Sequence, residues 1–140
     1  MIDNSFFFQI FLCCSIGAFG LIIGSFLNVL AYRLPRRESI VFPASHCPTC
    51  GNPVLPWDNI PIVSYIILMG KCRHCKSRIS PVYPAVEAFT GFMFAFLFMI
   101  HGANLIFISD ILLGCTLVVV FVTDIRHMII PDRLTDRKST

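Results

Sequence analysis

The chain has 140 residues, of which 56% are hydrophobic and only 14% are charged, and its mean hydropathy is +0.77. Soluble domains usually have about a quarter of their residues charged, so this composition excludes an ordinary water-soluble domain and indicates a protein embedded in lipid. The eleven Lys and Arg residues form two groups, at 33–78 and from 126 onward, separated by a long apolar run. Such spacing is typical of the positive-inside rule and argues against a nucleic-acid binder.

The first long apolar segment covers residues 6–32 and contains no charged residue. About 20 apolar residues suffice to cross the hydrocarbon core of a bilayer. No basic residue precedes the segment and no small-residue cleavage site follows it, as a signal peptide would require. Its positive charges follow instead, beginning at Arg33. We therefore predict that residues 1–32 form an uncleaved transmembrane helix with the N-terminus outside the cytoplasm.

Within this helix, Gly17, Gly20 and Gly24 are spaced by three and four residues. Small residues at this spacing allow two membrane helices to approach closely. Glycines that are merely tolerated in a membrane helix explain the pattern equally well. Asn28, near the inner end of the segment, receives no role from the sequence.

Residues 33–81 form a basic, proline-rich segment with turn signals, which predicts irregular structure and short strands rather than a long helix. Residues 60–69 are apolar enough for a short interfacial helix. Trp57 and Tyr65 are expected at the membrane surface, where aromatic residues with a polar group are enriched.

Two Cys-x-x-Cys pairs lie in this segment, 21 residues apart: Cys47, Cys50, Cys72 and Cys75. The spacing is one residue beyond the usual zinc-ribbon range. Four thiolates complete a closed tetrahedral site, so we predict a structural Zn²⁺ that folds the loop rather than a catalytic one. The alternative is that the cysteines form disulfides or remain thiols without a metal, and a reducing cytoplasm disfavours disulfides. His46 and His74 flank the pairs and are possible substitute ligands.

The second and third spans are predicted at residues 82–100 and 105–123, joined by a tight hairpin at 101–104. The hairpin has no Lys or Arg, which places it outside and residues 33–81 and 124–140 in the cytoplasm. The predicted fold is therefore an all-α membrane protein. It has three transmembrane helices and a cytoplasmic zinc-ribbon-like loop between the first and second.

Three acidic residues lie in or at the edge of the spans, namely Glu87, Asp110 and Asp124. Ionisable residues are rare in membranes and often mark function, although Asp124 also fits an ordinary interfacial carboxylate near Arg126. We expect Asp110 to snorkel or to form a hydrogen bond within the bundle. Glu87 is expected to contact Asp124 or a loop arginine.

An aspartic dyad needs two carboxyl groups within hydrogen-bonding distance. Asp110 and Asp124 are separated by about 21 Å along a helix, so they cannot form one. Pro131 disfavours helical geometry at Ile130. We therefore predict that the helix ends or bends there, with Asp132 in a turn.

Five stretches of the sequence, taken in order, resemble bacterial prepilin peptidases of aspartic peptidase family A24: residues 24–37, 47–51, 55–75, 77–91 and 123–135. These bifunctional enzymes act in type IV pilus and type II secretion systems. The resemblance implies an intramembrane protease of the bacterial inner membrane that cleaves prepilins or pseudopilins at the cytoplasmic face. It also implies methylation of the new N-terminal amine, with S-adenosylmethionine as the donor.

The resemblance also implies roles for individual residues. Asp124 matches a catalytic aspartate, and Asp132 and Glu87 match supporting positions. Gly70 and Lys71 match loop positions associated with methylation. The four cysteines match the zinc loop of the family.

The family's second catalytic aspartate lies in a Gly-x-Gly-Asp motif, which this sequence does not contain. The resemblance then implies a fragment, a truncated gene product or half of a split enzyme whose second half supplies that motif. Peptidase activity of the chain by itself is expected to be absent or very low, because aspartic proteolysis needs both carboxyl groups. The alternative is a non-catalytic, membrane-anchored zinc-ribbon module that binds prepilins or assembly partners.

Overall fold

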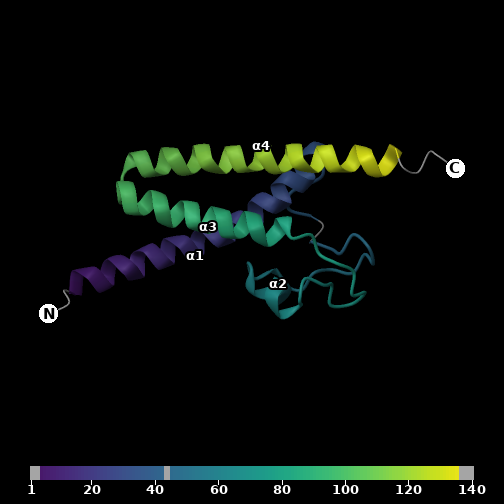
Figure 1. Cartoon of the computed structure of the whole chain (residues 1–140), viewed down its shortest axis with the longest axis horizontal. Helices are drawn as coiled ribbons and strands as arrows, with labels where there is room; N and C mark the ends of the chain where they lie inside the picture. Colours follow the sequence, from purple (N-terminus) through teal and green to yellow (C-terminus); the bar gives the residue numbers. More distant parts are fainter. Residues whose placement is uncertain (1–3, 43–44, 136–140) are drawn as a thin grey trace.

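The computed structural model describes residues 4–42 and 45–135, and every regular element in these residues is helical. Three long helices, α1 (Asn4–Arg33), α3 (Val82–His101) and α4 (Leu105–Thr135), form the body of the molecule (Figure 1). The segment between α1 and α3 contains the short helices η1 (Leu34–Arg36), η2 (Pro56–Asn59) and α2 (Val63–Ile67). The strands expected in this segment are reduced, within the described residues, to two isolated β-bridges.

The three long helices have the length and composition of membrane spans, at Phe6–Arg36, Val82–His101 and Leu105–Arg126. Between 11% and 28% of each span's most apolar window is buried inside the protein. Most of the apolar surface therefore faces outward, as it does when lipid is the solvent. The prediction of an all-α membrane protein with three spans is confirmed.

Helices α1 and α3 pack closely because glycines line their contact. A Cβ atom added at Gly20 would lie 2.8 Å from Phe94 Cβ, and one added at Gly24 would lie 2.9 Å from the Cα atom of Glu87. Across the contact, Gly91 accommodates the side chain of Leu21. The glycine spacing thus indicates a close helix–helix contact, and these glycines are not merely tolerated in a membrane helix.

The glycine contact predicts a position-dependent effect of alanine. Gly24→Ala is expected to lower the free energy of unfolding by about 1–3 kcal/mol, because the new methyl group meets the backbone of α3, which cannot move aside. Gly17→Ala is the matched control, since its Cβ would lie at ordinary contact distance, 3.5 Å from Ala95 Cβ. Thermal unfolding in detergent, followed by circular dichroism, measures both variants. Equal melting temperatures would contradict the contact.

The apolar core lies where α4 joins the other two helices. It consists of five buried side chains from all three helices: Leu27, Ala31, Val86, Val118 and Val122. One turn beyond Val122, the Arg126 guanidinium lies over the Tyr83 ring, 4.8 Å from its centroid, and near the Tyr32 ring. The core therefore fixes the ends of α1 and α3 that lead into the loop.

At the turn between α3 and α4, His101 Nε2 lies 3.2 Å from Asp110 Oδ2, so Asp110 contacts the neighbouring helix. The end of α4 differs from the prediction. The helix continues through Pro131 to Thr135, so the backbone of Asp132 is helical and not in a turn. A proline removes one backbone hydrogen bond but does not end a helix whose remaining bonds persist, as membrane helices often show.

Candidate functional site

The four cysteines of the loop form one cluster. Their Sγ atoms all lie within 4.8 Å of one another, and all four thiols are free. The Sγ atoms of Cys47 and Cys75 are 3.8 Å apart. Four sulfurs bound tetrahedrally at 2.3 Å around Zn²⁺ would be about 3.8 Å from each other. The donor set and spacing therefore fit zinc, and neither His46 nor His74 belongs to the cluster.

Each cysteine pair adopts the same tight turn. The carbonyl of Cys47 accepts a hydrogen bond from the N–H of Gly51, and the carbonyl of Cys72 accepts one from the N–H of Lys76. Gly51 and Lys76 occupy equivalent positions, and both have a positive φ, of 72° and 59°. Glycine adopts this conformation readily, whereas lysine is strained there. The two turns thus present their sulfurs to a common centre.

Local hydrogen bonds favour the thiolate at two of the four cysteines. The backbone N–H of Cys50 lowers the pKa of Cys47 to about 6. The side chain and then the backbone of Ser77 lower the pKa of Cys75. At Cys50, the Asn52 backbone lowers the pKa, but burial and the neighbouring cysteines outweigh it and raise the value to about 11. Cys47 and Cys75 are therefore prone to form thiolates, the form in which cysteine binds a metal.

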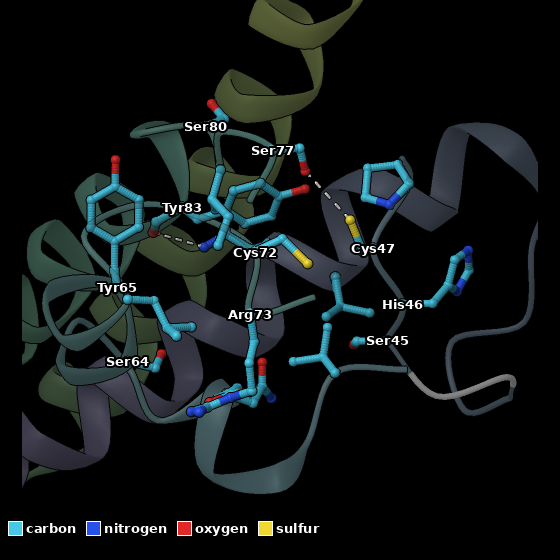
Figure 2. Close-up of a pocket in the computed structure, with 18 of the residues that line it drawn as sticks. Ser45, His46, Cys47, Ser64, Tyr65, Cys72, Arg73, Ser77, Ser80 and Tyr83 are labelled. Atoms are coloured by element: carbon cyan, nitrogen blue, oxygen red, sulfur yellow. Dashed lines mark hydrogen bonds and ion pairs between the residues drawn. The ribbon is translucent and has the colours of Figure 1, made fainter. Parts of the chain in front are cut away.

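A cavity of about 410 Å³ lies between the cysteine turns and the adjoining ends of α1 and α3 (Figure 2). Helix α1 contributes Ser25 and Asn28, and α3 contributes Tyr83 and Glu87. The loop contributes both cysteine turns and one side of α2. The cavity thus lies between the four-cysteine module and the membrane helices.

Two buried polar side chains lie where the cavity meets the helices. The Glu87 carboxylate accepts a 2.7 Å hydrogen bond from the N–H of Ile62, and the Ser25 hydroxyl also reaches it. This differs from the expected contact with Asp124 or a loop arginine. Asn28 Nδ2 donates to the Tyr83 carbonyl at 3.0 Å, while its buried Oδ1 has no partner among the described residues. No role was predicted for Asn28, although a polar residue near the end of a span is a recognisable signal.

An ion pair braces the loop side of the cavity. Arg73 donates from Nε to Asp58 Oδ2 at 2.8 Å and from Nη2 to Oδ1. The Arg73 guanidinium lowers the pKa of the Asp58 carboxyl. The pair connects η2 to the second cysteine turn, a contact between residues too far apart in sequence for any local pattern to indicate.

Gly70 supports the cavity wall indirectly. Its φ is 65°, and a Cβ atom there would lie 2.9 Å from Cζ and Oη of Tyr65, whose side chain lines the cavity. Neither Gly70 nor Lys71 lines the cavity itself. The main chain of Lys71 pairs with Arg78 in one of the two β-bridges. Gly70 is therefore placed to position Tyr65.

Gly70→Ala is expected to destabilise the loop more than Gly51→Ala. Both substitutions put alanine at a positive φ, which costs about 1–2 kcal/mol, but a Cβ atom at Gly51 has nothing within 4 Å. Only Gly70→Ala must also displace the Tyr65 ring. Denaturant unfolding in detergent, followed by the fluorescence of Trp57, compares the two variants. Equal losses would show that the contact with Tyr65 has no energetic consequence.

Asp124 lies apart from this cavity. Its side chain is exposed and lies two residues from both Val122 and Arg126, which face the other helices. A difference of two residues turns a helical side chain by about 200°, so Asp124 occupies the opposite face of α4. The side chain of Asp132 lies outside the described residues. The structure thus brings the cysteines and Glu87 to one cavity and leaves Asp124 on another surface.

The fold and the site define a helical membrane protein in which a four-cysteine module bordering a cavity separates the first two membrane helices. Residues 18–101, which include this module, match the bacterial peptidase A24 N-terminal domain. The match covers more than half of the sequence, and the chain belongs to this peptidase family.

Similar proteins include three that carry the name prepilin leader peptidase/N-methyltransferase. Those of Bacillus subtilis and Vibrio cholerae are each 40% identical, over 83% and 82% of this chain and 47% and 49% of their own length. That of Pseudomonas aeruginosa is 35% identical over 89% of this chain and 50% of its own length. The chain thus spans about half the length of the curated relatives it matches. No solved structure matches it.

Proposed function

We propose that this chain is the zinc-binding, membrane-anchored half of a prepilin leader peptidase and N-methyltransferase that processes type IV prepilins or type II secretion pseudopilins. The observation that carries the proposal is the four-cysteine cluster beside a cavity at the ends of the membrane helices, in a chain of this family. The names of the similar proteins support the same activity.

The charge distribution supports an orientation in the bacterial inner membrane. All eleven Lys and Arg residues lie in residues 33–81 and 124–140, and the hairpin between α3 and α4 has none. By the positive-inside rule, the cysteine loop and residues 124–140 face the cytoplasm and the N-terminus lies outside. The anchor is then residues 1–32, and residues 82–123 form the membrane hairpin.

Zn²⁺ in this protein would be held by Cys47, Cys50, Cys72 and Cys75. Four protein ligands leave no open coordination position, so the metal has a structural role. It ties the two cysteine turns together and thereby fixes the loop side of the cavity.

The part of the cavity beside Glu87 and Asn28 suits the positively charged groups of a ligand such as S-adenosylmethionine, which has a sulfonium and an ammonium group. A buried carboxylate at Glu87 and the unpartnered Oδ1 of Asn28 are the acceptors that such a ligand requires. When bound, S-adenosylmethionine supplies an electrophilic methyl group. Glu87 and Asn28 would orient the ligand, and Gly70 would act through Tyr65. Among the described residues, Lys71 has no side-chain contact that explains the association with methylation.

Proteolysis requires two carboxyl groups, one to activate water and one to donate a proton. We assign the first role to Asp124, with Asp132 as a supporting residue. Its partner aspartate would come from the region that corresponds to the other half of the relatives.

Reconstitution tests the proposal. The chain is placed in vesicles alone or together with a segment that contains a Gly-x-Gly-Asp motif, and leader cleavage and methyl transfer on a prepilin are measured by mass spectrometry. Both reactions are expected with the two parts together, and no cleavage with the chain alone. If the two parts together bind prepilin without processing it, the chain is instead a non-catalytic docking module.

A further inference from the structure

The short helix α2 is apolar on its outer side. Its outward-facing side chains Val63, Ile66 and Ile67 are 48%, 67% and 69% exposed. On the opposite side of the same turn, Ser64, Tyr65 and Leu68 line the cavity. A segment that faces water normally has the reverse arrangement, with its apolar face inward. This inverted pattern is typical of a segment whose inner side borders a polar cavity and whose outer side contacts an apolar environment.

The apolar surface extends beyond α2 on both sides. Trp57 and Ile60 precede the helix and Met69 follows it, and all three side chains are largely exposed. Together with Val63, Ile66 and Ile67 they form a surface that we call the interfacial segment, residues 57–69. No charged side chain other than Asp58 occurs in it, and Asp58 is paired with Arg73.

A buried hydrogen bond fixes the depth of this segment relative to the membrane helices. The N–H of Ile62 donates to Glu87 Oε2 at 2.7 Å. Glu87 is five residues inside α3, or about 7.5 Å from its beginning. Helix α2 is therefore folded back beside the first turns of α3 and does not project beyond them (Figure 1). Because α3 is a membrane span, the neighbouring apolar surface lies at the level where the span enters the lipid.

The segment is also held from its other side. The ion pair between Asp58 and Arg73 connects η2 to the second cysteine turn. With one contact to α3 and one to the cysteine module, the apolar surface is ordered before any partner covers it. Little conformational entropy is then lost on insertion into lipid.

We propose that the interfacial segment inserts its six outward-facing apolar side chains into the leaflet in which α3 begins. The partner is the lipid bilayer, because the segment continues the lipid-facing surface of a membrane span. It also carries Trp57, and tryptophans are enriched at membrane interfaces. The insertion places the cavity at the membrane boundary, with its polar wall of Ser64 and Tyr65 turned away from lipid. This inference does not depend on the chain being an enzyme.

Trp57 is the only tryptophan of the protein and serves as the reporter. The chain is reconstituted into vesicles of phosphatidylcholine and phosphatidylglycerol, with or without lipids brominated near the carbonyl end of the acyl chain. We expect Trp57 fluorescence to be quenched strongly by the brominated lipid. Quenching by aqueous acrylamide should be several-fold weaker than for N-acetyltryptophanamide.

Two outcomes would overturn the proposal. Full quenching by acrylamide without quenching by brominated lipid would show that the segment faces water. Protection from both quenchers would show that another part of the protein covers it. A second reporter, Ile67→Trp in a Trp57→Phe background, is expected to behave like Trp57. A matched control with Thr49→Trp in the same background, on the first cysteine turn, is expected to be open to acrylamide.

Discussion

Cys72→Ser is expected to abolish the binding of one zinc ion per chain and to unfold the segment between α1 and α3. In the described part of residues 34–81, Gly70 is the one residue that is buried, so the segment has no apolar core of its own. Structural zinc sites contribute apparent binding energies of about 10–16 kcal/mol, which are also folding energies in such small modules. Loss of one ligand opens the tetrahedron and removes most of this stabilisation.

Metal content by atomic emission and limited proteolysis of the loop measure this effect. The matched control is Cys115→Ser, which changes a cysteine of α4 that does not belong to the cluster. The control should retain zinc and an intact loop. Stoichiometric zinc in the purified Cys72→Ser protein would show that the four cysteines are not the ligand set. An unchanged proteolysis pattern would show that the metal does not fold the loop.

The features that could be predicted from the sequence are those with a local signature. The three spans follow from apolar runs of sufficient length, and the cysteine cluster follows from two Cys-x-x-Cys pairs at a ribbon-like spacing. The glycines of α1 had two possible meanings. Only the close approach of Gly20 and Gly24 to α3 decided between them.

The features that could not be predicted are contacts between distant segments. Glu87 was recognised as unusual, but its partner is a backbone N–H of the loop, and a backbone group has no sequence signature. The pairing of Asp58 with Arg73 likewise depends on how the loop folds. The prediction that Asp132 lies in a turn was wrong, because α4 continues past Ile130 to Thr135. The local preference of the residue before a proline is weaker than the continuity of a long helix.

Asp124→Asn is expected to lower leader cleavage by about 10²–10⁴-fold when the chain is assembled with the half that carries the second aspartate. Asparagine keeps the size of the side chain but can neither accept a proton from water nor share one with a partner carboxylate. Methyl transfer to a prepilin that is already processed should remain, because Asp124 does not line the cavity. Mass spectrometry of a prepilin substrate separates the two reactions.

The position of Asp124 supports this expectation. On α4 it continues a stripe of exposed apolar side chains that includes Leu113, Leu117 and Phe121, on the face opposite the core. An ionisable residue of a span normally faces other helices or a cavity and not lipid. This face of α4 is therefore where we expect a helix with the second aspartate to pack. Asp110→Asn, on the same helix and bonded to His101, is the matched control and should leave cleavage nearly unchanged. Equal loss in both variants would point to a general destabilisation of α4 and against a catalytic role of Asp124.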